Sequence, residues 1–288
     1  MKLLLFGSDG QLGARLETDL AALGRVRAMP GTACDLRDGA RVAALIAAER
    51  PDVIVNAAAY TAVDKAESEE GDASAVNTAA PRVMADAARA VGALLLQYST
   101  DYVFDGSACV PYTEDTRAAP LGVYGRTKFA GEEAIRASGC MHLILRTAWL
   151  YSNRGHNFLN TMLRLSADRD ELRVVNDQRG APTCADDVSA ASVAILRALR
   201  GVPGFDSARL GTYHVTNAGE CTWHDFASAI MRLANRKTRV TPITTAEYPT
   251  PARRPAYSVL SNDKLARVFG IRLPHWEQAL AACLAARA

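Results

Sequence analysis

The chain has 288 residues, 49% hydrophobic and 22% charged, the composition of a globular protein long enough for one large or two modest domains. Its net charge of +2 and its scattered basic residues give no electrostatic reason to expect binding to nucleic acid or to an anionic membrane surface. The six cysteines show no CxxC pairing and no apolar run approaches the ~20 residues of a membrane span, so we expect free thiols and a soluble cytoplasmic protein.

The first half of the chain alternates short apolar strands with helical patterns. Apolar runs predict strands at 2–6, 26–29, 52–56, 93–100 and 142–147. Helical spacing of apolar residues predicts helices at 12–23, which Gly24 stops, around 42–46, at 73–91 with Pro81 at a kink or in a fresh first turn, and after Tyr124. Such alternation is typical of an α/β, doubly wound parallel sheet covered by helices on both faces. Ligands of this fold bind at the carboxyl ends of the strands.

The second half of the chain is less regular. Its patterns predict helices at 157–168 and 185–199, strands near Val174 and at 211–217, and a helix capped by Thr222. The segment 244–262 is rich in Pro and Arg, which excludes a long helix or strand there. We expect two lobes that divide near residue 150, with part of 183–217 returning to the sheet of the first.

A glycine loop joins the first strand to the first helix. The stretch "FGSDGQLG" places Gly7, Gly10 and Gly13 in GxxGxxG spacing. The first glycine permits a tight turn, the second lets the backbone approach a pyrophosphate at the helix amino terminus, and the third allows close helix–strand packing. This motif requires a strand before it and a helix after it, and the sequence predicts both. We therefore expect a dinucleotide-binding, Rossmann-like domain at 1–150 and a smaller substrate-binding domain at 151–288.

The end of the second strand bears on the choice of cofactor. An acid there normally binds the adenosine ribose of NAD, but this strand ends "RVRAMPG" without one. Arg25 and Arg27 favour a 2′-phosphate and hence NADPH, although a solvated surface explains either arginine equally well, so NADH stays open. Asp35 follows within reach of the adenine end, and the small side chains of "NAAAY" at 56–60 leave room for a cofactor.

Two polar motifs supply residues for chemistry. "STDYVFDG" at 99–106 ends a buried strand with two hydroxyls and a carboxylate, which a cleft uses and a core does not. "VYGRTKFAGE" places Tyr124 and Lys128 four apart, on one face of a helix. A nearby ammonium lowers the pKa of a tyrosine, which can then exchange a proton with a carbonyl oxygen as hydride is transferred, while Thr100 or Ser99 holds that oxygen. YxxxK alone is common by chance, and it gains support from the glycine loop and the hydroxyl-bearing strand end upstream.

These motifs carry a resemblance that covers nearly the full chain. The chain resembles the extended short-chain dehydrogenases/reductases and, more closely, the family of dTDP-4-dehydrorhamnose reductases. Three later segments make the narrower resemblance specific. The segments that carry it are "FGSDGQLG", "RPDVIVNAAAYTAVDKAE", "STDYVFDG", "VYGRTKFAGE", "RTAWLY", "NDQRGAPT" and "YPTPARRP". The resemblance implies NAD(P)H-dependent reduction of the C4 ketone of dTDP-4-dehydro-L-rhamnose to dTDP-L-rhamnose, a precursor of cell-surface polysaccharide.

The resemblance also implies roles for individual residues. Tyr124 would protonate the C4 oxygen, Lys128 would hold the nicotinamide ribose and depress the pKa of the tyrosine, and Thr100 would bind the C4 oxygen. These three form the catalytic set. The substrate would be bound by Thr100, Asp101, Trp149 and Arg253. Of these, Arg253 would bind the phosphates of the substrate. The cofactor would be lined by Tyr124 and Lys128 together with Gly7, Gly10, Gln11, Leu12, Asp35, Leu36, Ala57, Ala58 and Ala59.

One departure concerns metal and assembly. Some family members form dimers through a metal bound by acidic residues, one of them on the first helix. Here Arg15 stands where an acid is expected, so we expect no metal-bridged dimer. Asp186 and Asp187 are better explained as a solvated helix start, and Mg²⁺ and a homodimer stay open. The five histidines show no metal spacing and are interpreted as structural or surface residues.

Three alternatives remain at this point. A 4,6-dehydratase needs a Glu after the strand-end Asp. Because Tyr102 stands there instead, the sequence argues against dehydration. A nucleotide-sugar epimerase stays open, because the same Tyr and Lys serve it. A non-catalytic regulatory subunit of methionine adenosyltransferase would not require Thr100, Tyr124 and Lys128, and all three are present.

Overall fold

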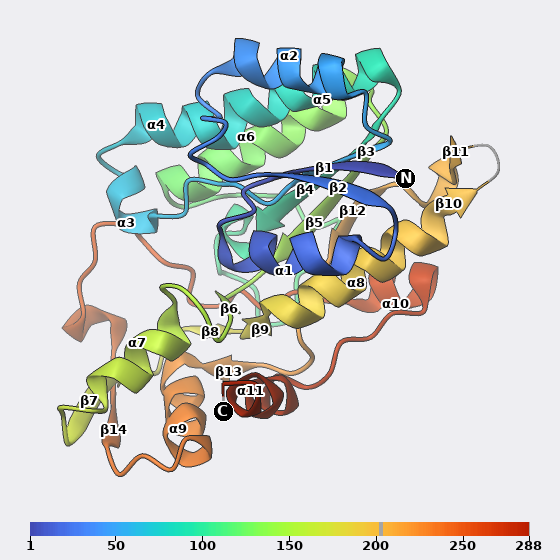
Figure 1. Cartoon of the computed structure of the whole chain (residues 1–288). Helices are drawn as coiled ribbons and strands as arrows, with labels where there is room; N and C mark the ends of the chain where they lie inside the picture. Colours follow the sequence, from blue (N-terminus) through green and yellow to red (C-terminus); the bar gives the residue numbers. More distant parts are fainter. Residues whose placement is uncertain (202–203, 288) are drawn as a thin grey trace.

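A computed structural model describes residues 1–201 and 204–287. At its centre lies a six-stranded sheet in the order β12-β5-β4-β3-β1-β2, in which every pair of neighbours is parallel (Figure 1). The predicted α/β doubly wound fold is confirmed. The strands are β1 (Lys2–Phe6), β2 (Arg25–Met29), β3 (Val53–Asn56), β4 (Leu94–Thr100), β5 (His142–Thr147) and β12 (Gly211–His214).

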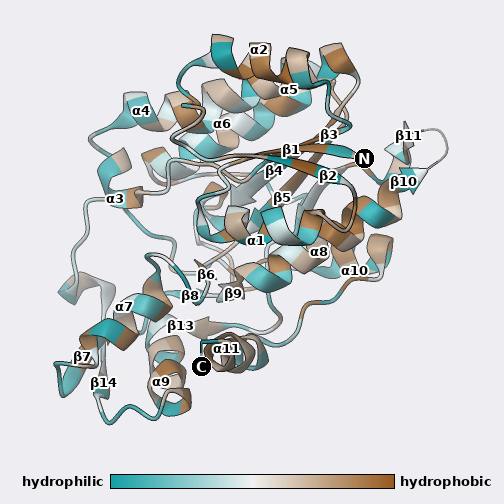
Figure 2. Cartoon of the chain, in the orientation of Figure 1, coloured by the Kyte–Doolittle hydropathy of each residue, from teal (hydrophilic) through white to brown (hydrophobic). Residues whose placement is uncertain are grey.

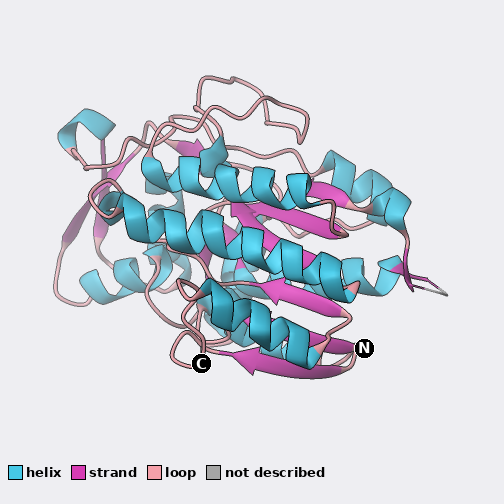
Figure 3. Cartoon of the chain, turned by 90° about the horizontal axis from the view of Figure 1, so that it is seen from above, coloured by secondary structure: helices cyan, strands magenta, loops and turns pink. Residues whose placement is uncertain are grey.

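Helices cover both faces of this sheet (Figures 1 and 3). One face carries α2 (Gly39–Glu49), α5 (Ala80–Val91) and α6 (Val123–Ser138), and the other carries α1 (Gln11–Leu20) and α8 (Ala185–Leu199). Side chains alternate between the faces, as the period of two in a strand requires. In β1, Leu3 and Leu5 pack with α1 and α8, whereas Leu4 and Phe6 pack with α2 and α5. The strands are apolar on both faces, and Figure 2 shows the matching hydrophobic stripes on the covering helices.

The predicted helix at 73–91 is interrupted in the structure. It comprises α4 (Glu70–Ser74), a π-helical turn η1 (Ala75–Ala79) and α5, and α3 (Val63–Ala66) precedes them. Pro81 lies in the first turn of α5, where its missing N–H costs nothing, so the fresh first turn is the correct alternative. The helix predicted at 12–23 ends earlier, at Leu20, and a turn leads to Gly24.

Two later segments return to the central sheet. Strand β12 pairs with β5, and α8 packs against α1, with Ser189 Oγ donating to Asp19 at 2.8 Å. The strand predicted at 211–217 is thus shorter than expected but lies at the edge of the sheet. The division into domains at residue 150 stays a prediction.

Most of the remaining elements pack around a separate hydrophobic cluster that includes the fully buried Tyr151 and Phe226, whereas Leu265 and Phe205 pack with the core of the central sheet. As predicted, Thr222 caps α9 (Trp223–Leu233): its hydroxyl accepts from the Asp225 N–H at 3.1 Å, and the Asp225 carboxylate accepts from the Thr222 N–H at 3.0 Å. The other strands and α-helices are β6 (Leu150–Tyr151), α7 (Phe158–Leu165), β7 (Glu171–Val175), β8 (Arg179–Gly180), β9 (Thr183–Cys184), β10 (Arg200–Gly201), β11 (Gly204–Phe205), β13 (Cys221–Thr222), β14 (Arg239–Ile243), α10 (Asp263–Phe269) and α11 (Trp276–Ala285). Short 3₁₀ turns are η2 (Asp101–Val103), η3 (Ser207–Arg209) and η4 (Thr245–Glu247). Within the described ranges, none of the helices combines the length and the apolarity needed to cross a membrane.

Candidate active site

A cavity of about 780 Å³ lies at the carboxyl ends of the central strands. Its lining joins residues that follow β1, β3, β4 and β5, as expected for a doubly wound sheet. The predicted site residues that line it are Gly7, Gly10, Gln11, Leu12, Ala57, Ala58, Ala59, Thr100, Asp101, Tyr124, Lys128 and Trp149. One cavity therefore contains the glycine loop, the strand-end hydroxyl of Thr100 and the Tyr–Lys pair.

The three loop glycines have different surroundings. Gly7 has φ +77°, and a Cβ there would lie 2.6 Å from the Ala58 nitrogen. A Cβ on Gly13 would lie 1.8 Å from the Gly7 carbonyl oxygen, so only glycine lets α1 approach the loop this closely. Among the described residues, a Cβ on Gly10 would meet only the Gly7 oxygen, at 3.4 Å, and no side chain caps α1 at this position. Open space beside an uncapped helix amino terminus fits a dinucleotide pyrophosphate.

Gln11 links the glycine loop to a distant segment. Its side-chain oxygen accepts from Asn157 Nδ2 at 2.7 Å and from Ser152 Oγ at 3.2 Å. Asn157 is also the N-cap of α7, where its own oxygen accepts from the Asn160 N–H at 2.9 Å. These contacts hold the wall of the cavity that contains Gly155, His156 and Asn157 against α1.

Thr100 and Asp101 form a hydrogen-bonded pair at the end of β4. The Thr100 hydroxyl donates to Asp101 Oδ1 at 3.0 Å and accepts from the Tyr102 N–H at 3.2 Å. Asp101 is 1% exposed, and its Oδ2 has no hydrogen-bond partner among the described residues. Burial raises the pKa of Asp101 to about 6, against the hydrogen bonds that favour its carboxylate. The hydroxyl of Thr100 is thereby oriented beside the phenol of Tyr124, whose pKa it lowers.

Helix α6 presents Tyr124 and Lys128 on one face, as the spacing predicts. Glu67 caps the helix from the end of α3 by accepting from the Val123 N–H at 2.8 Å. Gly125 lets the helix pack against the chain after β4, because a Cβ there would lie 2.2 Å from the Tyr102 carbonyl oxygen. Lys128 Nζ donates to the Tyr98 carbonyl at 2.7 Å.

The expected lowering of the tyrosine pKa is wrong for this structure. Burial raises the pKa of Tyr124 to about 12, and the Thr100 hydroxyl opposes this only in part. Away from water, the phenolate loses more solvation free energy than its hydrogen bonds and neighbouring groups give back. Tyr124 is consequently a protonated phenol at neutral pH, which is the form that can donate a proton.

Trp149, which lines the cavity, is held in an unusual backbone conformation. Its φ is +46°, and its indole stacks on that of Trp223 with ring centroids 3.5 Å apart and planes 7° apart. Gly180 leaves room for this stack, because a Cβ there would lie 2.5 Å from the Trp149 ring. Together the two indoles form a flat apolar wall suited to a sugar ring or a base.

Three predicted site residues do not line the cavity. Asp35 is bound by Arg37, whose NH2 lies 2.7 Å from Asp35 Oδ2, and hydrogen bonds from Arg37 lower the pKa of Asp35 to about 2. Leu36 is buried in the core beneath α2 and α5. Arg253 is exposed on its loop, whereas its neighbour Arg254 pairs with Asp64 at 2.8 Å.

The use of Arg25 and Arg27 as evidence for NADPH is also wrong. Arg25 is the first residue of β2, far along the strand from its carboxyl end at Met29. Arg27 bonds to the carboxylate of Glu49 at the end of α2. A 2′-phosphate is bound beyond the carboxyl end of this strand, so neither arginine is placed to contact it.

Several cavity residues escaped the sequence analysis. Trp223 is among them, since nothing local distinguishes it from a core aromatic at the start of an amphipathic helix. His156 was interpreted as structural or surface, and it is exposed and lines the cavity. Ser99, which was considered beside Thr100 for the carbonyl oxygen, lines the cavity as well. The other lining residues that were not predicted are Asp9, Gly31, Thr61, Val63, Tyr98, Tyr102, Thr147, Ala148, Leu150, Gly155 and Asn157.

The acidic residues considered for a metal have protein partners. Asp186 Oδ1 lies 3.7 Å from Arg15 Nε, and Asp187 accepts from Asn217 Nδ2 at 2.7 Å. Arg15 also binds Asp19 on its own helix at 2.9 Å, and its ion pair with Asp186 joins α1 to α8. In the described part of the chain, no three His, Cys, Asp or Glu side chains gather as metal ligands would.

Comparison with known proteins adds to this geometry. The family model described as the RmlD substrate binding domain matches residues 1–288. A dTDP-4-dehydrorhamnose reductase of Burkholderia thailandensis is 44% identical over 99% of this chain and 98% of its own. The crystal structure of a dTDP-4-dehydrorhamnose reductase from Clostridium acetobutylicum has a TM-score of 0.93 at 38% identity, with 99% of both chains covered. That of the Bacillus anthracis dTDP-4-dehydrorhamnose reductase in complex with NADP has a TM-score of 0.92 at 35% identity, again with 99% of both covered.

Proposed function

The chain belongs to the family of the RmlD substrate binding domain, and from this membership we propose the reaction and the roles of its residues. It is an NAD(P)H-dependent oxidoreductase that reduces the C4 ketone of dTDP-4-dehydro-L-rhamnose to dTDP-L-rhamnose. The observation that carries the assignment of the site is the single cavity that joins the glycine loop to Thr100, Tyr124 and Lys128.

The residues of the cavity fit a nicotinamide cofactor at one end and a sugar at the other. The bound cofactor supplies the hydride for C4. Gly7 and Gly10 leave the backbone of the loop open to the pyrophosphate, and Ala57–Ala59 form the floor next to it. Of the two nicotinamide cofactors we propose NADPH, supported by the Bacillus anthracis relative that was crystallised with NADP.

Proton donation falls to Tyr124. The phenol holds its proton at neutral pH and can release it to the far more basic alkoxide that forms at C4. Thr100 lies beside it and in this structure donates its one hydroxyl proton to Asp101, so it can hold the same carbonyl oxygen once that proton turns from Asp101 to the substrate. Lys128, 5% exposed and fixed by the Tyr98 carbonyl, places a positive charge near the phenolate that remains.

The substrate end of the cavity is formed by residues from later in the chain. Trp149, stacked on Trp223, offers a flat face to the sugar. The Pro-rich loop is anchored to α3 by Asp64, which accepts from the Ala252 N–H at 3.2 Å and from Arg254 at 2.8 Å. Because Asp64 already pairs with Arg254, Arg253 is the guanidinium of this loop that is available for the substrate's phosphates.

The reaction is tested by following cofactor oxidation with dTDP-4-dehydro-L-rhamnose, with NADPH and NADH in parallel. We expect oxidation that depends on the sugar and is faster with NADPH at equal subsaturating concentration. Tight cofactor binding without turnover would contradict the substrate, and equal rates with both cofactors would contradict the preference for NADPH.

Replacing Arg253 with alanine should raise the KM for the nucleotide sugar by roughly tenfold, because one charged hydrogen-bond partner of the phosphates is lost. The kcat and the KM for NADPH should stay unchanged. Arg239→Ala is the matched control, since Arg239 is a 74% exposed arginine that pairs with Glu171 on β7. An unchanged KM for the sugar in Arg253→Ala would remove this residue from the site.

A further inference from the structure

Helix α6 carries a row of polar residues that extends beyond the Tyr–Lys pair. Tyr124, Lys128, Glu132 and Arg136 follow one another at intervals of four, so they share one face of the helix. The first two line the cavity, and the next two continue along the helix under the sheet. Glu132 is 1% exposed, which is rare for a glutamate unless it is paired.

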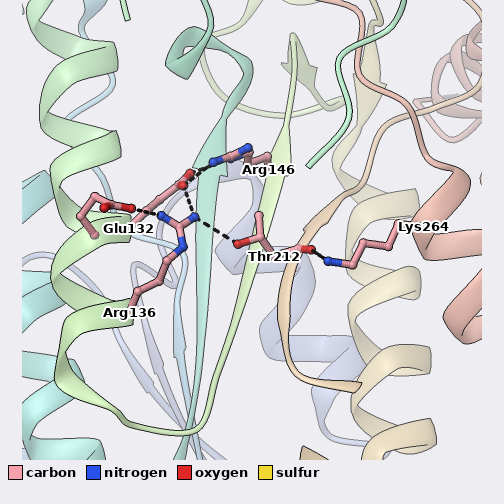
Figure 4. A network of polar contacts seen from close by, with 6 residues as sticks. Glu132, Arg136, Arg146, Thr212 and Lys264 are labelled. Atoms are coloured by element: carbon pink, nitrogen blue, oxygen red, sulfur yellow. Dashed lines mark hydrogen bonds and ion pairs between the residues drawn. The ribbon is translucent and has the colours of Figure 1, made fainter. Parts of the chain in front are cut away.

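Two arginines hold Glu132. Arg146 on β5 forms a bidentate pair with it, with Nε to Oε1 at 2.9 Å and NH2 to Oε2 at 2.6 Å, and Arg136 NH2 reaches Oε2 at 2.7 Å (Figure 4). Arg146 is itself 3% exposed. Burial alone would raise the pKa of Glu132, but the hydrogen bonds and charge of Arg146 outweigh it and keep the pKa below its ordinary value. Glu132 is therefore a carboxylate at neutral pH.

Among the residues that the structure describes, Lys128, one turn before Glu132, has no charged hydrogen-bond acceptor. It donates to the neutral carbonyl of Tyr98. Burial lowers the pKa of Lys128 to about 8, and the negative charge of Glu132 opposes that fall. The titratable and charged groups that approach this face of α6 are Asp101 and Tyr102 on η2, Tyr124, Glu132 and Arg136 on α6, Arg146 on β5, and His214 on β12, which burial keeps neutral. The Tyr98 phenol lies on the other face of the sheet, where it bonds to Ser192 on α8.

We propose that Glu132, held by Arg146, is a positioning residue that keeps Lys128 an ammonium in the active site. This inference rests on the proposed function of Lys128 beside Tyr124. Once Tyr124 has given up its proton, a neutral amine would leave the buried phenolate without a counter-charge. A buried ion pair adds little net stability, because apolar residues of similar volume often stabilise the fold equally well. The presence of this pair is therefore better explained by its effect on the electrostatic field in the active site.

The proposal is tested by the titration of Lys128 in the purified protein without substrate. The chain has five lysines, Lys2, Lys65, Lys128, Lys237 and Lys264, so lysine labelled with ¹³C at Cε gives few NMR signals, and Lys128→Arg identifies the one of interest. In Glu132→Gln, the midpoint of that signal should fall by about one pH unit, since the negative charge that raises the pKa of Lys128 is gone while the shape of the side chain is kept. The alkaline limb of kcat/KM should move in the same direction.

Glu133→Gln is the matched control. Glu133 is the adjacent carboxylate, 57% exposed, and it pairs with Arg136 on the solvent side, so its loss should leave the Lys128 midpoint in place. Arg136→Gln supplies a change of opposite sign. Arg136 is 32% exposed, so the variant should fold, and removal of its charge exposes Lys128 to more of the field of Glu132 and should raise the midpoint.

An unchanged Lys128 midpoint in folded Glu132→Gln overturns the proposal. If that variant does not fold, an unchanged or lowered midpoint in Arg136→Gln overturns it, and a raised midpoint supports it. Because this titration needs neither sugar nor turnover, absence of reductase activity would count against the proposed function and not against the role of Glu132.

Discussion

Tyr124→Phe should lower kcat by about 10²- to 10⁴-fold while the Kd for NADPH stays unchanged. The substitution removes the hydroxyl that we assign as proton donor and keeps the ring, which packs edge-on against Tyr102 at 5.4 Å between centroids. Steady-state kinetics with dTDP-4-dehydro-L-rhamnose measures the first effect, and fluorescence titration of the free enzyme measures the second.

The control for this variant is Tyr213→Phe. It also removes a phenol hydroxyl, one that donates to the Arg209 carbonyl at 2.8 Å on the edge strand β12, away from the cavity. We expect its kcat to equal that of the wild type. Near-full activity of Tyr124→Phe would show that another group protonates the C4 oxygen, with Thr100 the next to test.

The loop glycines Gly10 and Gly13 should give different losses when each is replaced by alanine. Gly10→Ala should raise the Kd for NADPH by roughly 10- to 100-fold with little change in Tm, because its methyl group occupies space that the protein itself leaves open. Gly13→Ala should lower the free energy of unfolding of the cofactor-free protein by about 1–3 kcal/mol, because its methyl group would overlap the Gly7 carbonyl. Calorimetric titration with NADPH and denaturant unfolding separate the two effects.

Gly71→Ala provides the reference for both glycine variants. Gly71 lies in α4, and a Cβ there meets no atom of the described chain within 4 Å, so stability should hold or rise slightly and cofactor affinity should not change. A normal NADPH affinity in Gly10→Ala would place the pyrophosphate elsewhere, and an unaltered unfolding free energy in Gly13→Ala would contradict the close packing of α1 on the loop.

Much of the fold and part of the site are encoded locally and could be predicted. The apolar runs of β1, β3, β4 and β5 and the helical spacing between them depend on neighbouring residues alone. Parallel strands bring their carboxyl ends to one edge, so the glycine loop, Thr100 and Tyr124 were expected in one place, and they line one cavity.

Contacts between distant segments could not be predicted in this way. Asp35 has the sequence position of a cofactor ligand, but Arg37 and the fold of the loop occupy its carboxylate. Trp223 becomes a wall of the cavity only because α9 is brought beside Trp149, and Gly180 from a third segment makes room for the stack. No local pattern specifies which of many aromatic residues will meet.

The sequence by itself determined the doubly wound sheet, the glycine loop and the Tyr–Lys face of α6, because strand and helix periodicity and glycine chemistry act within a few residues. Only the tertiary structure decided the ionisation of the site. Burial turned the expected low pKa of Tyr124 into a high one, and the packing of α6 on the sheet brought Glu132 and Arg146 together from a helix and a strand. The pKa of a buried group depends on how much hydration it loses and on which charges lie near it. Both are set by the fold of the whole chain, so they cannot be worked out from a motif.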